Sequence, residues 1–266
     1  MPGIMIGLED VRKTYPGGVQ AVRGVDLHVR EGELLVLLGE SGCGKTTLLK
    51  MINRLIEPTS GRILIGGRNN RETDPVQLRR GIGYVFQGIG LFPHLSVGDN
   101  VATVPRLLGW KPERVGEKVD RLLELVKLPP GEYRDRLPRQ LSGGQRQRVG
   151  LARALAGEAS IMLMDEPFGA LDPLNRDRLQ DEFRRIHDDL GLTTLMVTHD
   201  MTEALLLADR IGVMKSGGLL QADTPARMLD HPEHEYVENM LATPRRQAER
   251  LEALAAGDAS QQTSDG

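Results

Sequence analysis

This chain of 266 residues has little cysteine, no excess of basic charge and no long apolar run. Its single cysteine, Cys43, excludes an intramolecular disulfide, so a reducing environment is the default expectation. No uninterrupted apolar run is longer than that of residues 34–38, which falls far short of the roughly 20 residues that a membrane-spanning helix needs. Lysine and arginine total 34 against 37 acidic residues, which gives a net charge of −3. We therefore expect a protein that neither crosses a membrane nor binds nucleic acid.

Glycine is plentiful, and a glycine-rich segment directly follows the apolar run. Its order is Gly-x-x-x-x-Gly-Lys-Thr, in which glycines let backbone N–H groups surround phosphates at the positive end of a following helix. Lys45 adds charge toward the β and γ phosphates, and Thr46 offers a hydroxyl to Mg²⁺. The predicted nucleotide contacts here are Gly39, Glu40, Ser41, Gly42, Cys43, Gly44, Lys45, Thr46 and Thr47.

Two alternatives concern this phosphate loop. A purely structural glycine turn is one, but a lysine followed by a threonine serves no turn geometry. For Cys43, a redox-sensitive thiol and a small side chain that fills the loop are both open interpretations.

A second element for nucleotide chemistry follows the apolar residues 161–164. This run predicts a buried strand, and Asp165 and Glu166 emerge at its carboxyl end, where ligands bind in open α/β sheets. Asp165 is the expected partner of Mg²⁺, and Glu166 can polarise a water that attacks the γ phosphorus in line. Paired acids at a strand end are otherwise ordinary surface charge, but the phosphate loop upstream favours the functional interpretation.

Three further side chains carry little information alone and gain meaning from their order. Gln87 ends an apolar strand, where its amide can reach the metal or the water, although a lone glutamine is usually solvated. His199 follows the apolar residues 195–198, where a structural histidine is the commoner case. Tyr15 precedes a Pro-Gly-Gly turn, and its ring either stacks on adenine or covers the domain edge.

The chain begins with strands and then alternates strands with helices, which predicts an α/β fold around a mainly parallel sheet. The first two strands predict an antiparallel β subdomain, and a proline-interrupted helical pattern at about 97–156 predicts an inserted helical subdomain. The predicted strands are 5–14, 20–30, 34–38, 61–66, 82–87, 161–165, 193–198 and 211–215, and the predicted helices are 46–56, 97–108, 113–127, 143–156, 174–190 and 201–208.

Leu-Ser-Gly-Gly-Gln at residues 141–145 lies between the phosphate loop and the acidic strand end. A helix that begins at Ser142, Gly143 and Gly144 offers a second anion site, for which one chain has no phosphate of its own. Two chains placed head to tail would give each nucleotide a phosphate loop from one chain and this helix start from the other. The pattern therefore predicts a homodimer in which closure and catalysis are one event.

This ordered set of residues resembles the nucleotide-binding subunits of ABC transporters, over residues 4 to about 242. The resemblance implies a P-loop NTPase fold, ATP and Mg²⁺ as ligands, and ATP hydrolysis as the activity. It implies that Glu166 is the water-activating base, that His199 contacts the γ phosphate and that Gln87 is the coupling glutamine. Tyr15 would stack on adenine. The implied metal site is Thr46, Gln87 and Asp165.

The resemblance also assigns residues to the contact between two subunits. Ser142 and Gly144 would bind the γ phosphate of the nucleotide held by the opposite subunit, with Gly143 and Gln145 beside them. Asp172 would lie at the dimer seam. Many family members have serine where this chain has Gly169, a departure that touches seam packing and not the metal-binding acids.

Longer stretches resemble the ATPase subunits of osmoprotectant importers for glycine betaine, choline and related quaternary amines. They are residues 50–61, 88–94, 100–105 and 166–173. This resemblance implies integral membrane permease subunits as partners, a substrate-binding protein that acts indirectly, and a peripheral position on the cytoplasmic face of the cell membrane. An importer ATPase for a different small solute is the alternative, and a soluble ABC ATPase acting on ribosomes or DNA comes after it.

The predicted organisation is one ATPase domain over residues 1–242 and a short tail over 243–266. The tail is expected to be helical at first, to be disordered over 257–266, and to be too short for the paired regulatory module of many relatives.

An apolar cluster, Leu91-Phe92-Pro93, lies in a predicted loop after Gln87. Exposed apolar clusters in loops mark partner surfaces, which suggests a contact with the membrane subunit. A small core cluster between the two subdomains is the alternative.

Overall fold

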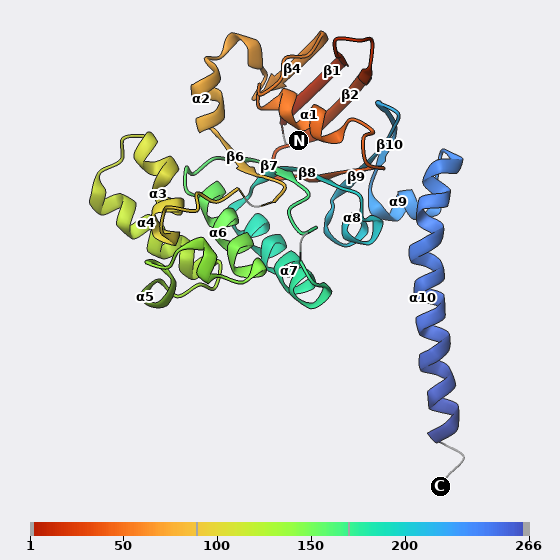
Figure 1. The fold of residues 1–266 in the computed structure, drawn as a ribbon. Helices are drawn as coiled ribbons and strands as arrows, with labels where there is room; N and C mark the ends of the chain where they lie inside the picture. Colours follow the sequence, from red (N-terminus) through yellow and green to blue (C-terminus); the bar gives the residue numbers. More distant parts are fainter. Residues whose placement is uncertain (1–2, 89, 170, 263–266) are drawn as a thin grey trace.

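The computed structural model of the chain describes residues 3–88, 90–169 and 171–262, with side chains described as far as residue 250. Ile89, Ala170 and residues 263–266 belong to segments discussed above and lie outside the described residues. Figure 1 shows two sheets, a group of helices below them and one long helix at the opposite side. Within the described ranges, no helix combines the length and the apolar character needed to cross a membrane.

The larger sheet has six strands in the order β10-β9-β3-β8-β7-β6, and only β10 runs antiparallel to its neighbour. The strands β3, β7 and β8 are buried along their whole length because both faces of the sheet are covered. The mainly parallel core is thus confirmed, and the carboxyl ends of its strands share one edge. The strands are β3 (Leu34–Leu38), β6 (Ile82–Val85), β7 (Ile161–Asp165), β8 (Thr193–Thr198), β9 (Arg210–Lys215) and β10 (Gly218–Asp223).

The smaller sheet is antiparallel, with the order β2-β1-β4-β5. It covers one face of the larger sheet, and the helix α1 (Lys45–Ile52) lies between them (Figure 1). Leu48 and Leu49 of α1 share a buried cluster with Val25 of the small sheet and Leu37 of the large one. The strands are β1 (Ile4–Thr14), β2 (Gln20–Arg30), β4 (Ser60–Ile65) and β5 (Arg68–Asn69).

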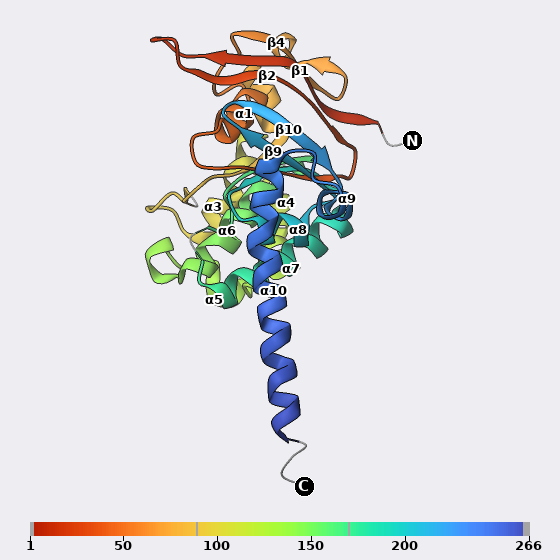
Figure 2. The ribbon, with the colours of Figure 1, turned by 90° about the vertical axis from the view of Figure 1, so that its right-hand side faces the viewer.

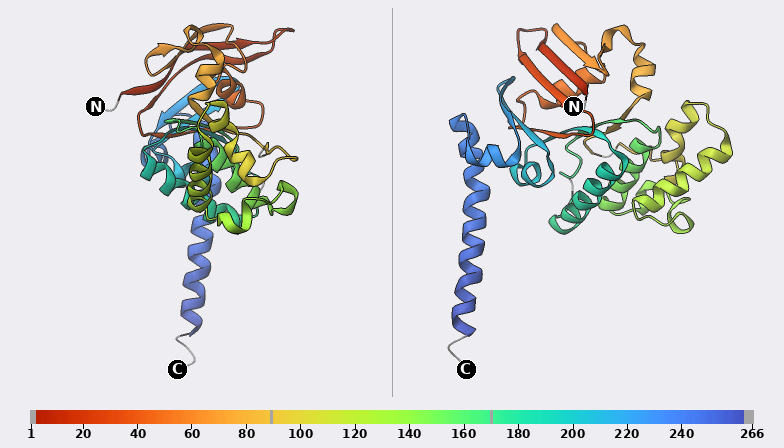
Figure 3. Two further views of the ribbon diagram at one scale, coloured as in Figure 1. Left: turned by 90° about the vertical axis from the view of Figure 1, so that its left-hand side faces the viewer. Right: turned by 180° about the vertical axis from the view of Figure 1, so that it is seen from behind.

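Helices occupy the chain between the neighbouring strands β6 and β7. Pro112 and Pro130 stand at the first position of their helices, where a missing N–H costs nothing, and Pro105 lies near the end of its own. Figure 3 shows this group of helices at the end of the molecule opposite the C-terminal helix. The helices are α3 (Val97–Leu107), α4 (Pro112–Leu125), α5 (Pro130–Tyr133), η2 (Pro138–Gln140) and α6 (Gly143–Leu155).

The remaining helices include several that the sequence pattern did not predict. The unpredicted helices η1, α2, α5, η2 and α9 and the unpredicted strand β5 are short, so they carry too few residues for a clear periodicity. The strand β10 was also not predicted, although it is as long as β9. The longest helix, α10, projects away from the body in Figure 2 and covers residues 257–262, where we expected disorder. Residues 251–256 are rich in alanine and leucine, which favours continuation of the helix into residues 257–262. The helices are η1 (Asn70–Glu72), α2 (Pro75–Arg80), α7 (Pro173–Leu190), α8 (Met201–Leu207), α9 (Pro225–Asp230) and α10 (Glu235–Gln262).

Candidate active site

The predicted phosphate loop joins β3 to α1, as the motif requires. Lys45 is only 5% exposed, and its Nζ donates to the carbonyl oxygens of Gly39 at 2.6 Å and Glu40 at 2.9 Å. The buried ammonium group of Lys45 is therefore bound by carbonyl oxygens of the loop. The oxygens of a bound anion would replace these carbonyls as its partners.

Two glycines of this loop, Gly39 and Gly44, lie where a β-carbon would clash with a backbone carbonyl. Gly44 has a φ of 107°, and a β-carbon placed on it would lie 2.3 Å from the carbonyl oxygen of Ala21. On the side of the loop facing β9 and β10, the N–H of Gly217 donates to the carbonyl of Cys43 at 3.0 Å. Cys43 is itself buried, with its Sγ 3.6 Å from Lys45 Nζ. Strand β2 and the β9–β10 turn thus fix the loop from behind.

Thr46 and Asp165 meet at the carboxyl end of β7. The Thr46 hydroxyl donates to Asp165 Oδ1 at 2.9 Å. Burial raises the pKa of Asp165, and the bond from Thr46 opposes that shift. A hydroxyl and a carboxylate side by side are the oxygen donors that Mg²⁺ prefers, so these residues fit a magnesium ion. Among the described residues no group of three histidine, cysteine or acidic side chains is arranged to hold a metal.

Glu166 receives side chains from the two neighbouring strand ends. Gln87 follows β6, and its Nε2 donates to Glu166 Oε2 at 3.1 Å. His199 follows β8, and its Nδ1 lies 3.5 Å from Glu166 Oε1. Glu166 has a φ of 46°, which is uncommon for a residue with a β-carbon and is typical of functional sites. Three side chains that the sequence separates by many residues are thus brought together.

The Leu-Ser-Gly-Gly-Gln segment forms the start of α6. Ser142 and Gln145 make a capping box, in which Ser142 Oγ accepts from Gln145 N at 3.3 Å and Gln145 Oε1 accepts from Ser142 N at 2.9 Å. Tyr133 OH accepts from Gln145 Nε2 at 3.2 Å. A β-carbon on Gly143 would meet no atom within 4 Å, so the helix start is open to solvent on that side.

Asp172 lies next to this helix start, at the N-cap of α7. Its carboxylate accepts from the backbone and side-chain nitrogens of Asn175, and the side-chain bond lowers the pKa of Asp172. Asn175, Ser142 and Gly144 line one cavity of about 240 Å³, and no phosphate-loop residue belongs to its lining. Residues 141–145, called the signature segment below, and Asp172 are therefore neighbours, separate from the phosphate loop of their own chain.

Tyr15 lies at the end of β1, before the turn to β2. Its ring is half-buried, and Lys13 Nζ lies 5.2 Å from the ring centroid. Stacking on adenine therefore stays a prediction for this residue.

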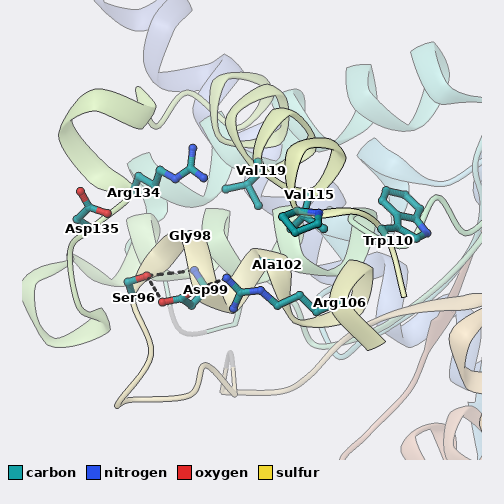
Figure 4. Close-up of a pocket in the computed structure, with 12 residues that line it drawn as sticks. Ser96, Gly98, Asp99, Ala102, Arg106, Trp110, Val115, Val119, Arg134 and Asp135 are labelled. Atoms are coloured by element: carbon teal, nitrogen blue, oxygen red, sulfur yellow. Dashed lines mark hydrogen bonds and ion pairs between the residues drawn. The ribbon is translucent and has the colours of Figure 1, made fainter. Parts of the chain in front are cut away.

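A cavity of about 240 Å³ between α3 and α4, shown in Figure 4, is lined by none of the predicted site residues. Within its lining Arg106 pairs with Asp99 at 2.8 Å. Ser96 Oγ, at the entrance to α3, accepts from Asp99 N at 3.1 Å. This cavity is a feature of the helical subdomain, remote from the strand ends that hold Asp165 and Glu166.

The comparison with known proteins agrees with this geometry. A family model described as ABC transporter matches residues 22–169, more than half of the chain. The chain belongs to the ABC transporter family.

Relatives of this ABC transporter chain carry names that refer to transport. It is 54% identical over 241 residues to the glycine betaine/carnitine/choline transport ATP-binding protein OpuCA of Bacillus subtilis, covering 91% of this chain and 63% of that protein. It is 46% identical over 262 residues to the osmoprotectant import ATP-binding protein OsmV of Salmonella typhimurium, covering 97% of this chain and 68% of that protein. The chain thus spans about three-fifths of the length of OpuCA.

Solved structures share the fold. The dimeric structure of the ATP-binding cassette MJ0796, in a post-hydrolysis state bound to ADP and Pi, has a TM-score of 0.75 and 33% identity, covering 83% of this chain and 99% of that one. The structure of cbiO1 from Clostridium perfringens has a TM-score of 0.78 and 28% identity, covering 87% of this chain and 92% of that one. The P-loop ABC ATPase fold is therefore established for this chain.

The sequence pattern missed several residues that contact the predicted site. Arg176 and Asp200 bond to the segments that follow β7 and β8, and Gln180 Nε2 donates to the buried Glu203 at 2.8 Å. Asp200 carried one available signal, since an aspartate before a helical run is a typical N-cap. Arg176 carried none, because an arginine on a helix is ordinarily a solvated side chain.

Proposed function

We propose that the chain is the ATP-hydrolysing subunit of an ABC importer. The observation that carries this proposal is the placement of Glu166 between Gln87 and His199. Glu166 also directly follows Asp165, which is bonded to Thr46. An acid held by an amide and an imidazole at the carboxyl edge of a parallel sheet is suited to activating a water.

Each side chain has a role that follows from its position. Lys45 would exchange its loop carbonyls for phosphate oxygens, and Thr46 and Asp165 would hold Mg²⁺. When bound, Mg²⁺ neutralises developing charge on the phosphates. Glu166 would accept a proton from the attacking water, and His199, whose Nδ1 lies 3.5 Å from Glu166 Oε1, would contact the γ phosphate.

The same proposal includes a homodimer. Ser142 and Gly144 are remote from the phosphate loop of their own chain but form an open helix start, which suits a phosphate brought by a second copy. The similarity to the MJ0796 cassette, whose structure is dimeric, supports this arrangement.

The test of hydrolysis is Glu166→Gln, which keeps the side-chain shape and removes the base. We expect ATP binding to persist while turnover falls by about 100-fold or more, and a nucleotide-bound dimer to accumulate. Glu124→Gln, at an exposed glutamate of α4, is the matched control and should behave like the parent chain. Parent-level turnover in Glu166→Gln would remove the assignment of the base.

The proposed cargo is an osmoprotectant such as glycine betaine, choline or another quaternary amine. The support is the similarity to OpuCA and OsmV, whose names refer to such solutes. In this proposal the chain sits peripherally on the cytoplasmic face of the membrane, bound to integral permease subunits, with a substrate-binding protein acting indirectly. Co-purification with the permease, followed by solute binding to the associated receptor, tests the cargo, and binding of only a different small solute would replace it.

A further inference from the structure

Arg176 lies in the first turn of α7 and contacts two segments of the site at once. Its Nη2 donates to the carbonyl oxygen of Leu171 at 3.1 Å, and its Nη1 lies 3.5 Å from Asp200 Oδ2. Its side chain is 32% exposed, so the guanidinium group is partly shielded from water. A single guanidinium group therefore joins the chain after β7 to the chain after β8.

Helix stability does not explain an arginine at this place. The N-terminal end of a helix carries partial positive charge, so a cation in the first turn of α7 opposes the helix dipole. Arg178, on the same helix and exposed, has no ion pair with any described residue. The partners of Arg176, and not the helix, account for its position.

One partner, Asp200, is firmly placed. Its Oδ1 accepts from the backbone nitrogens of Thr202 at 2.9 Å and Glu203 at 3.1 Å, which caps α8. Its own N–H donates to Thr198 Oγ1 at 3.1 Å. Because Asp200 directly follows His199, whatever holds Asp200 also limits the position of the histidine beside Glu166.

The other partner, Leu171, touches the signature segment. Leu171 is 6% exposed, and its Cδ2 lies 3.9 Å from the place where a β-carbon of Gly144 would be. Its N–H donates to the carbonyl of Phe168 at 3.2 Å, so it is bonded back toward Glu166 as well. A shift of Leu171 would therefore change the packing next to Gly144.

The space enclosed by these groups is small. Glu166, His199, Arg176 and Asp200 line one cavity of about 20 Å³, enough for about one water molecule. The contacts thus form a closely packed unit, in which one part cannot move far without moving the others.

We propose that Arg176 is a positioning residue that ties the signature segment to the hydrolytic side chains of the same chain. This inference rests on the proposed function, in which Ser142 and Gly144 serve the partner's nucleotide while Glu166 and His199 serve the chain's own. Arg176 would then keep the two half-sites of one subunit in register, so that both composite sites of the dimer assemble together.

The test compares Arg176→Met with Arg178→Met on the full chain. In Arg176→Met we expect kcat to fall by about tenfold or more while the KM for ATP changes by no more than about twofold. Arg176→Lys keeps the charge facing Asp200 but lacks the planar fork, so its kcat should be intermediate. Arg178→Met should match the parent chain. An unchanged kcat in Arg176→Met overturns the proposal.

Amide hydrogen exchange without nucleotide provides a readout that does not need hydrolysis. Arg176→Met should speed exchange in both segments, near Leu171 and near Asp200, and leave exchange in the antiparallel sheet unchanged. Faster exchange in one segment alone, or in neither, overturns the proposal that Arg176 links the two segments. If Arg176→Met does not fold, Asp200→Asn replaces it, because the amide keeps the cap of α8 and removes the charge that faces Arg176. A parent chain without ATPase activity would overturn the proposed function only, since the exchange result stands by itself.

Discussion

Phe92 separates two interpretations of the apolar loop after Gln87. Its ring is 42% exposed, whereas its backbone is fixed by the fully buried Asn100, whose side chain accepts from Phe92 N at 2.8 Å and donates to Phe92 O at 3.2 Å. The guanidinium of Arg153 lies 5.8 Å from the centroid of the Phe92 ring, and the centroid of the His94 ring lies 6.2 Å from it in an edge-on arrangement. A rigid backbone presenting a half-exposed ring favours a partner surface over a core cluster.

The cost of Phe92→Ala follows from that exposure. Complete burial of a phenylalanine side chain stabilises a protein by about 1.5 to 3 kcal/mol, and a little over half of this ring is buried, so the loss should be about 1 to 1.5 kcal/mol. For a chain of this length such a loss lowers Tm by about 2 to 6 °C. Phe183→Ala is the control, because Phe183 is fully buried and should lose about 3 to 5 kcal/mol.

The assay measures melting temperature, basal ATPase activity and capture by the membrane subunit on one preparation. Phe92→Ala should melt close to the parent chain, keep its basal ATPase activity and bind the membrane subunit weakly. A fall in Tm as large as that of Phe183→Ala, with normal capture, would refute the interface and support the core cluster.

Three more predictions concern the site. Gly44→Ala should cost about 2 kcal/mol or more and abolish nucleotide binding, as read by melting with and without ATP, because the new methyl meets the Ala21 carbonyl at 2.3 Å; an ATP-dependent rise in Tm would contradict this. Ser142→Arg should abolish hydrolysis with little change in ATP affinity of the monomer, and mixing it with Lys45→Ala chains should restore some activity in heterodimers; full activity in a chain that cannot dimerise would refute action in trans. Burial raises the pKa of Glu203, so its ionisation costs stability as pH rises from its unfolded pKa through its folded one. Glu203→Gln should therefore raise Tm at pH 8 and lose this advantage near pH 4, and an equal effect at both pH values would contradict the assignment.

The strand ends of the site were predictable because each is marked by an uninterrupted apolar run followed by polar residues. Asp165, Gln87 and His199 all follow such runs, and parallel strands bring their carboxyl ends to one edge. The contacts of Glu166 with Gln87 and His199 follow from the order of the strands in the sheet. No local sequence pattern predicts that order.

Other features were out of reach of the sequence for physical reasons. Arg176 acts through the Leu171 carbonyl and the Asp200 carboxylate, which lie beside predicted site residues, but an arginine on a helix gives no sign of which groups it will contact. The short elements α2 and α9 depend on the N-caps Asp74 and Thr224 more than on periodicity. The long helix α10 keeps its form past residue 257, where the small polar residues predicted disorder.

The insertion of the helical group between β6 and β7 has a consequence for the order of folding. These strands pair directly, although residues 86–160 separate them in the chain. A flexible connection of that length makes pairing slow, but a connection that has already folded holds its two ends close together. We therefore expect the helices to form before β7 joins the sheet, which pulse-labelled hydrogen exchange during refolding can observe. Asp165 and Glu166 would then reach their places among the last residues of the site. A partly folded chain would therefore lack a complete hydrolytic site and could not hydrolyse nucleotide.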